Sequence, residues 1–104
     1  MATVHFSRSA KADLLHIGAY TLQTWGAAQA GCYLDSLECC AKLLASNPLL
    51  GRPCDWVRPG LYRFEKKRHV LFYRLQKNGI LVSRILHQSM MPDMQSFEDV
   101  PPDV

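Results

Sequence analysis

The sequence contains none of the short motifs that mark the commonest small enzyme sites. It has no G-x-x-x-x-G-K-[ST] phosphate loop, no G-x-G-x-x-G turn, no G-x-S-x-G nucleophile elbow and no H-E-x-x-H zinc motif. The nucleotide-binding, serine-hydrolase and metalloprotease classes therefore have no support. A chain of 104 residues has room for one small domain.

Long apolar runs and paired cysteines are also missing. No run approaches the roughly 18 apolar residues of a membrane span, and polar side chains interrupt the first ten residues, where a secretory signal would be apolar. We therefore expect a cytoplasmic protein without membrane contact. The four cysteines form no C-x-x-C pair, so we expect reduced thiols, with Cys32 and Cys39 packed in or near the core. Because no spacing gathers zinc ligands, we expect neither a metal nor a cofactor.

Acidic residues are scarce in the middle of the chain. Residues 52–84 hold nine basic and two acidic side chains, whereas residues 85–104 hold four acidic side chains and no basic one. A basic segment of this density attracts nucleic acid, an acidic peptide or an acidic protein, or it is simply a solvated face. The acidic tail contains Pro101 and Pro102, and we expect it to fray. Such a tail can also screen a basic face.

Two amphipathic helices are predicted before Pro48. A serine in Ser7-Arg8-Ser9 can cap the first helix, Gly26 can stop it, and Asn47-Pro48 closes the second. With almost no linker between them, the helices form an antiparallel hairpin. The first apolar stripe comprises Leu14, Ile17, Thr21 and Trp25, and the second comprises Ala30, Tyr33, Leu34, Leu37, Ala41, Leu44 and Ala45.

The remaining periodic segments favour strands. A loop rich in proline and glycine over residues 47–60 follows the helices, and Trp56 within it is expected to cover the edge of the core rather than to anchor a partner. The segments with alternating or β-branched residues are 3–6, 61–65, 69–76 and 79–87.

The dipeptide Asn78-Gly79 predicts the pairing between the last two strands. If these two residues form the turn, the numbers of opposite residues sum to 157, which places Tyr73 opposite Arg84. One face of the sheet takes the helices. The other face, carrying His69, Tyr73 and Arg84, is expected to be a partly exposed apolar patch for a partner.

The basic and aromatic side chains of the sheet also match the residue types for metal-free RNA cleavage, which needs a base, an acid and cations. The inferred register, however, puts His87 on the opposite face from His69. A single catalytic cluster with both histidines is therefore not expected. The residues of the required types are Arg63, His69, Tyr73, Arg84 and His87.

Short motifs along nearly the whole chain together resemble one family, the ParE branch of the RelE/ParE toxins of bacterial type II toxin–antitoxin systems. Their order and spacing, rather than any one of them, carry this resemblance. The motifs are Phe6-Ser7-Arg8-Ser9-Ala10-Lys11-Ala12-Asp13-Leu14, Tyr20, Trp25-Gly26, Tyr33, Leu37, Asn47-Pro48, Gly51-Arg52, Arg58-Pro59-Gly60-Leu61, Arg68-His69-Val70-Leu71-Phe72-Tyr73-Arg74 and Arg84-Ile85-Leu86-His87-Gln88.

The resemblance implies an α+β fold of order β-α-α-β-β-β. In it, an N-terminal strand and an antiparallel helical hairpin pack on an antiparallel sheet. We expect one toxin domain over residues 1–88 and an acidic, proline-containing tail over residues 89–104.

The resemblance also implies a non-catalytic toxin that binds DNA gyrase, blocks it and leaves DNA broken. A ParD-like antitoxin would neutralise it in a hetero-oligomeric complex, and no direct sequence-specific binding of nucleic acid is expected. An apolar groove rimmed with cations suits an acidic, amphipathic antitoxin segment. The candidate residues for target and antitoxin binding are Arg63, His69, Tyr73, Arg84, His87, Gln88 and Met90.

Two alternatives stay open. Members of the RelE branch cleave mRNA on the ribosome, but they place cations where this chain has Val70 and Ser89, which disfavours that activity. Many ParE-like toxins read His-Gln-Arg after the last strand, whereas this chain reads His87-Gln88-Ser89. The second alternative is therefore an inactive family member that is kept only as a partner of an antitoxin.

Overall fold

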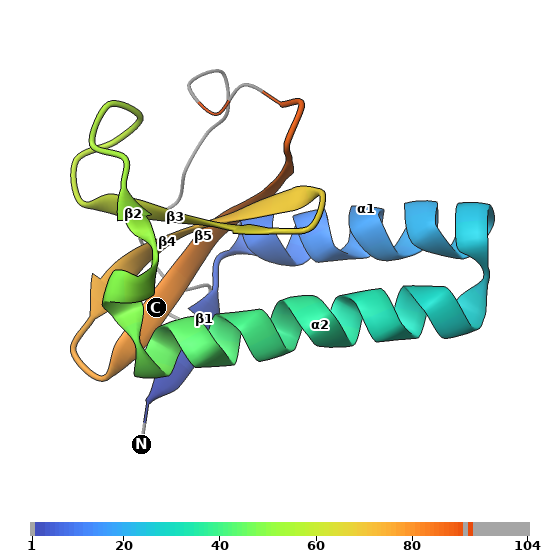
Figure 1. Cartoon of the computed structure of the whole chain (residues 1–104), viewed down its shortest axis with the longest axis horizontal. Coiled ribbons are helices and arrows are strands. Elements are labelled where there is room, and N and C mark those ends of the chain that lie inside the picture. The colour runs from blue at the N-terminus through green and yellow to red at the C-terminus, as the bar shows by residue number, and fades with distance from the viewer. Residues whose placement is uncertain (1, 91, 93–104) are drawn as a thin grey trace.

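The computed structural model describes residues 2–90 and residue 92. Two helices lie side by side against one face of a five-stranded sheet (Figure 1). The α+β fold predicted from the sequence is confirmed. In chain order the elements are β1 (Thr3–Phe6), α1 (Arg8–Trp25), α2 (Ala27–Ser46), the short 3₁₀ helix η1 (Pro48–Leu50), β2 (Arg52–Pro53), β3 (Leu61–Lys66), β4 (His69–Gln76) and β5 (Gly79–His87).

The sheet is mixed rather than purely antiparallel. Its strand order is β1-β5-β4-β3-β2, and β1 runs parallel to β5 while the other pairs are antiparallel. Gly79 makes the parallel pairing possible, because a Cβ atom at that position would lie 1.8 Å from the carbonyl oxygen of Thr3. The N-terminal strand therefore docks beside the last strand of the domain.

The ends of the helices follow the signals in the sequence. Ser7 caps α1, because its Oγ accepts the Ala10 N–H at 3.0 Å and donates to the Ser83 carbonyl at 2.7 Å. Gly26, with φ 95°, separates the two helices, and Asn47 ends α2. The same hydroxyl that starts α1 thus ties the helix to β5.

The predicted stripe of α2 is largely buried, whereas the stripe of α1 differs at both ends. Trp25 is 62% exposed, and Leu14 is only partly buried. Asp13, which no apolar pattern would select, is buried instead. The buried residues of α1 are Ala10, Asp13, Ile17 and Thr21.

The predicted register of the last hairpin is wrong. Gln76 pairs with Gly79, so Lys77 and Asn78 form the turn, and an irregularity between Phe72 and Tyr73 shifts the register once more. Tyr73 consequently lies opposite Val82 rather than Arg84. His69 lies directly opposite His87, so the two histidines share a face.

Apolar side chains are buried on both faces of the sheet. Between the helices and the sheet lies a core that includes Leu37, Leu44, Leu71 and Ile85. The loop between β2 and β3 covers a second cluster on the other face, so the predicted open patch there is wrong. This cluster comprises Cys54, Val57, Leu61, Val70, Phe72 and Leu86.

Two further expectations about single side chains fail. Trp56 belongs to the covering loop, but its own side chain is 66% exposed, so the ring does not close the edge of the core. Cys32 and Cys39 are exposed on α2, whereas Cys40 and Cys54 are buried. All four thiols are free in this structure.

Within the described ranges, no helix has both the length and the apolar content that a membrane crossing requires. Apart from residues 89, 90 and 92, the predicted acidic tail lies outside the part of the chain that the structure describes. The boundary at residue 88 stays a prediction.

Candidate partner-binding groove

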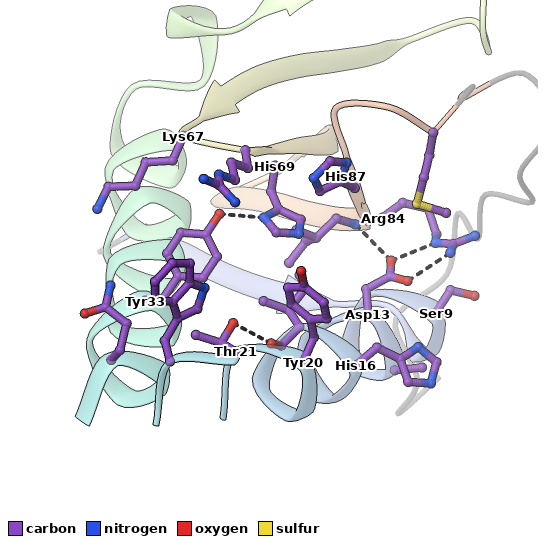
Figure 2. Close-up of a pocket in the computed structure, with 17 residues that line it drawn as sticks. Ser9, Asp13, His16, Tyr20, Thr21, Tyr33, Lys67, His69, Arg84 and His87 are labelled. Carbon is purple, nitrogen blue, oxygen red and sulfur yellow. Dashed lines mark hydrogen bonds and ion pairs between the residues drawn. The ribbon is translucent and has the colours of Figure 1, made fainter. Parts of the chain in front are cut away.

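A groove of about 800 Å³ lies between the helices and the ends of the central strands. Its walls come from α1, the first turns of α2, the turn between β3 and β4, and the ends of β4 and β5 (Figure 2). One part of the lining is aromatic, with Tyr20, Trp25 and Tyr33. Another part is basic, with Lys67 and Arg68. We call this the partner-binding groove.

A buried ion pair fixes the floor of the groove. The Asp13 carboxylate accepts bonds from Arg84 Nε at 2.8 Å and Arg84 Nη2 at 2.9 Å, and it also accepts the Ile85 N–H at 2.9 Å. The side chains of the pair are 11% and 12% exposed. Three charge-assisted hydrogen bonds to one carboxylate hold α1 against β5 at this point.

A pair of histidines lies beside the ion pair, one from β4 and one from β5. The rings of His69 and His87 meet edge to face with centroids 5.4 Å apart. Burial lowers the pKa of His69, the positive charge of a protonated His87 lowers it further, and Asp13 opposes both effects. A neutral His69 can accept the hydrogen bond that the Tyr33 hydroxyl offers to its Nδ1 atom, as Figure 2 shows.

Tyr33 links this pair to the basic rim. Burial raises the pKa of its hydroxyl, and Arg68 partly opposes that effect. Lys67 lies with its Nζ atom 5.9 Å from the centre of the Tyr33 ring. Lys67 also adopts a left-handed backbone angle, φ 55°, in the tight turn from β3 to β4. This turn carries Lys67 and Arg68 and so forms the basic rim of the groove.

The residues after β5 continue the wall of the groove. The Gln88 N–H donates to the Arg68 carbonyl at 2.8 Å, which ties the chain to the basic turn. The Ser89 N–H lies 3.2 Å from His87 Nδ1, and the Ser89 hydroxyl lies 2.7 Å from the same atom. Met90 follows, and its side chain lines the groove while remaining 41% exposed.

The structure brings together four of the seven residues predicted as a binding face, namely His69, Arg84, His87 and Met90. Gln88 adjoins them through the hydrogen bond of its N–H group.

Tyr73 and Arg63 lie elsewhere. Tyr73 is fully buried in the core beneath the helices, where its hydroxyl donates to the Pro48 carbonyl at 2.6 Å and accepts the Gly51 N–H at 3.0 Å. Burial raises the pKa of this hydroxyl. Arg63 is directed to the loop-covered face, with its guanidinium 5.9 Å from the centre of the Phe72 ring. Neither residue lines the groove.

Sequence reasoning did not select several groove residues. Asp13 carried a usable signal, because it lies four residues before Ile17 on the predicted buried stripe, and a carboxylate there requires a cationic partner. Tyr20, Tyr33, Lys67 and Arg68 carried no such signal, since nothing local relates the helices to the turn between β3 and β4.

The described residues hold no group of three or more histidine, cysteine, aspartate or glutamate side chains that could bind a metal ion. The side chains that line the groove offer hydrogen bonds, cations and aromatic surfaces. These groups suit an acidic ligand that also carries apolar side chains.

Comparisons with known proteins agree on one family. Residues 4–92 match the family model described as the ParE toxin of the type II toxin–antitoxin system parDE. The chain is 40% identical over 92 residues to Toxin ParE1 of Caulobacter vibrioides, which covers 86% of this chain and 93% of that protein. It is 41% identical over 88 residues to Toxin ParE1 of Mycobacterium tuberculosis, covering 84% of this chain and 90% of that protein.

A solved structure described as the chromosomal ParDE TA system from P. aeruginosa has a similar fold. The TM-score is 0.70 at 24% identity, and the match covers 84% of this chain and 96% of that one. At this identity the likeness supports the arrangement of helices and strands alone. Since the family model spans most of the chain and two relatives exceed 30% identity, the chain belongs to the ParE toxins of type II toxin–antitoxin systems.

Proposed function

We propose that this ParE toxin acts in the cytoplasm by binding DNA gyrase and blocking it without catalysis of its own. In the same proposal, a ParD-like antitoxin covers the toxin in a hetero-oligomeric complex and so neutralises it. Family membership over residues 4–92 is the observation that carries this proposal. The similar solved structure is itself described as a ParDE system, which is consistent with an antitoxin partner.

The surroundings of two positions support a non-catalytic role. Val70 occupies a place where RelE-type nucleases have a cation, and it is buried beneath the loop on the face opposite the helices. Ser89 occupies the other place, and its hydroxyl lies 2.7 Å from His87 Nδ1. Without these cations a scissile phosphate would lack its main charge stabilisation.

The groove has the composition of a protein-binding surface. Tyr20 and Trp25 are 63% and 62% exposed although both line a concave site. Aromatic side chains and arginine dominate the binding energy of many protein interfaces. Basic residues at the rim would raise the rate of encounter with an acidic partner.

A gyrase cleavage assay tests this proposal. Purified protein would be incubated with gyrase, ATP and supercoiled plasmid, and the reaction would be stopped with detergent and run on a gel. We expect linear DNA that depends on the protein. If the plasmid stays unchanged over a wide range of concentrations, gyrase is not the target.

Two double variants test whether the groove is the surface that binds gyrase. Tyr20→Ala with Trp25→Ala removes two exposed rings from the groove, and we expect at least a tenfold loss of linear product. Leu49→Ala with Trp56→Ala is a matched control, because these side chains are 74% and 66% exposed and neither lines the groove. Equal activity of both variants would remove the groove from the target surface.

One observation favours a second candidate, a metal-free endoribonuclease. The register predicted from the sequence separated His69 from His87, but the structure places their rings side by side in the groove. In such a reaction a base takes the proton of a ribose 2′-hydroxyl, the 2′-oxygen attacks the adjacent phosphorus, and the leaving 5′-oxygen receives a proton from an acid.

Primer extension on messages from cells that express the toxin separates the two candidates. Discrete cuts that disappear with His69→Gln would support the nuclease. Intact messages in growth-arrested cells would leave gyrase inhibition as the better account.

A further inference from the structure

The two edges of the sheet differ in how well they are protected. At one end of the strand order lies β2, which has only two residues, Arg52 and Pro53. Proline protects an edge because it has no N–H group to donate. At the other end lies β1, whose sequence TVHF contains neither proline nor a lysine, arginine or carboxylate side chain. No strand of the described residues pairs with its outer side, so this edge can accept a further strand.

The hydrogen bonds of β1 show which backbone groups face the open side. The Thr3 N–H donates to the Asn78 carbonyl at 2.7 Å, and the Ser7 N–H donates to the Val82 carbonyl at 3.0 Å. Alternate residues of a strand direct their backbone groups to the same side, so the N–H and C=O groups of residues 4 and 6 point away from β5. An added strand would therefore find a donor and an acceptor at each of these two residues.

A cavity of about 490 Å³ lies beside this edge, between β1 and the second half of α2. An added strand would direct every second side chain toward α2 and so into the cavity. The cavity has no lining residue in common with the partner-binding groove. Its lining residues are Ala2, Val4, Phe6, Glu38, Lys42 and Ser46.

Glu38 and Lys42 make this edge complementary to a second copy of itself. They are exposed, lie four residues apart on α2, and form no ion pair with any other described residue. A twofold axis perpendicular to the sheet reverses the direction of α2 in the second copy, so the carboxylate of each copy comes to the side where the other has its ammonium group. The same axis makes two β1 strands antiparallel, with Val4 of one copy opposite Phe6 of the other.

We propose that the open edge of β1 pairs with the same edge of a second copy about this twofold axis, which gives one continuous sheet across two chains. Glu38 of each copy then faces Lys42 of the other. The contact on each side is one strand of four residues and about one turn of α2, so the dimer is weak and depends on the protein concentration. Both copies keep their partner-binding grooves, and the inference requires neither gyrase nor an antitoxin.

Charge reversal on α2 tests the proposal, with sedimentation over a hundredfold range of protein concentration as the measurement. Glu38→Lys places like charges opposite one another in the dimer, and so does Lys42→Glu, so we expect each variant to weaken association at least tenfold. Glu38→Lys with Lys42→Glu only exchanges the two charges, and it should associate nearly as strongly as wild type. An equimolar mixture of the two single variants should form mixed dimers.

A matched control separates local pairing from overall charge. Asp35→Lys alters an exposed acidic residue of α2 that does not line the cavity, and it changes the net charge as much as Glu38→Lys does. Association of this variant should be within about threefold of wild type, because an exposed charge away from the contact contributes little.

Hydrogen exchange of the wild-type chain tests the strand pairing itself. A rise in protein concentration should slow the exchange of the Val4 and Phe6 N–H groups at least tenfold. The Ser7 N–H, which is already bonded to Val82, should exchange at an unchanged rate. Val4→Pro removes an outward donor without removing a bond to β5, so it should give an unchanged circular dichroism spectrum and a monomer.

Three outcomes would overturn the proposal. A chain that stays monomeric at every concentration would leave the edge to a strand of a different protein. A double variant that associates no better than the single variants would show that the two charges do not face one another. Dimers with unchanged exchange at Val4 and Phe6 would place the contact on another surface.

Discussion

The two faces of the sheet are both covered, but by different means and with different results. A hairpin of two long helices covers one face, and the loop between β2 and β3 covers the other. Figure 1 shows the connection between α1 and α2 standing well beyond the strands. The groove lies on the helical side, between α1, the first turns of α2 and the strands β4 and β5, whereas the loop covers the apolar cluster on the other face.

Because of this difference, residues of β4 and β5 that face the helices have different roles from those that face the loop. On the helical side, the cover is fixed to the sheet by polar contacts that lie in the groove, including the pair of Asp13 with Arg84. On the loop side, the cover packs on the apolar cluster around Phe72, and Arg74 donates a hydrogen bond to the Pro59 carbonyl at 2.6 Å. The helical side thus combines structural groups with residues of the candidate groove, and we expect variants there to affect both the stability and the groove.

Breaking the buried ion pair should have the largest effect on the helical side. Asp13→Ala leaves Arg84 and the Ile85 N–H without their shared acceptor. We expect a loss of about 3–5 kcal/mol in the free energy of unfolding, as is typical when one partner of a buried pair is removed. Urea unfolding followed by circular dichroism measures it.

An exposed ion pair is the control. Arg52→Ala removes the contact of Arg52 with Glu65, whose side chains are 73% and 56% exposed, and it should cost less than about 1 kcal/mol. A similar, small loss in both variants would show that Asp13 does not fix α1 to the sheet. Alanine at Arg84 also leaves a buried charge unpaired, so it cannot test binding by itself.

Removing one hydroxyl from the core beneath the helices should have the next largest effect. Tyr73→Phe deprives the Pro48 carbonyl and the Gly51 N–H of their partner, and we expect a loss of about 1–3 kcal/mol. Thermal unfolding measures the change. The ring of Tyr62 stacks on that of Tyr73, and Tyr62→Phe should stay within about 0.5 kcal/mol of wild type. Equal losses would contradict the role given to the Tyr73 hydroxyl.

Acid should weaken the helical side through His69. Its pKa in the folded chain lies below the 6.5 of the free side chain, so the unfolded chain takes up the proton first as the pH falls. The stability contributed by neutral His69 is therefore present above pH 6.5 and is lost as the pH falls through the lower pKa of the folded chain.

His69→Gln provides the comparison, because glutamine can still accept a hydrogen bond from Tyr33 but does not titrate. The free energy of unfolding of this variant should fall less steeply than that of wild type as the pH is lowered from neutrality. Carboxylates contribute equally to both curves and cancel. Parallel curves would mean that His69 contributes nothing to the acid sensitivity.

The smallest effect concerns the rates at which the two covers open. Cys40 of α2 is buried in the core between the helices and the sheet, and Cys54 of the loop is buried in the cluster on the other face. Burial raises the pKa of both thiols. Local opening of a short loop is easier than separation of a helix from its core. We expect iodoacetamide to label Cys54 before Cys40, with exposed Cys32 and Cys39 labelled first. Mass spectrometry measures the order, and earlier labelling of Cys40 would reverse our view of the two covers.

Local signals in the sequence predicted most element boundaries. Ser7, Gly26 and Asn47-Pro48 mark the helix ends because each acts on groups within a few residues. The register of the last hairpin was missed because Gly79 has a partner far away in the sequence. Its lack of a Cβ atom admits Thr3, and the turn forms one residue earlier.

The candidate site was predicted only in part, again because sequence signals are local. His69, Arg84 and His87 come from the neighbouring strands β4 and β5, Met90 follows β5, and all four belong to the groove. Tyr73 was assigned to it through the wrong register and an assumed open face, whereas Arg63 was included for its residue type. The aromatic wall depends on how far α1 and α2 extend beyond the sheet, which no local pattern contains.

The parallel pairing of β1 with β5 also determines when the sheet can be completed as the chain is synthesised. Thr3 pairs with Gly79, and the Ser7 hydroxyl that caps α1 reaches the Ser83 carbonyl, so the first strand has no place in the sheet until the last strand has left the ribosome. Contacts between such distant parts of the chain form slowly. Because β5 also supplies Arg84, Ile85 and His87 to the groove, the nascent toxin remains without a complete groove until the final stretch of its domain emerges.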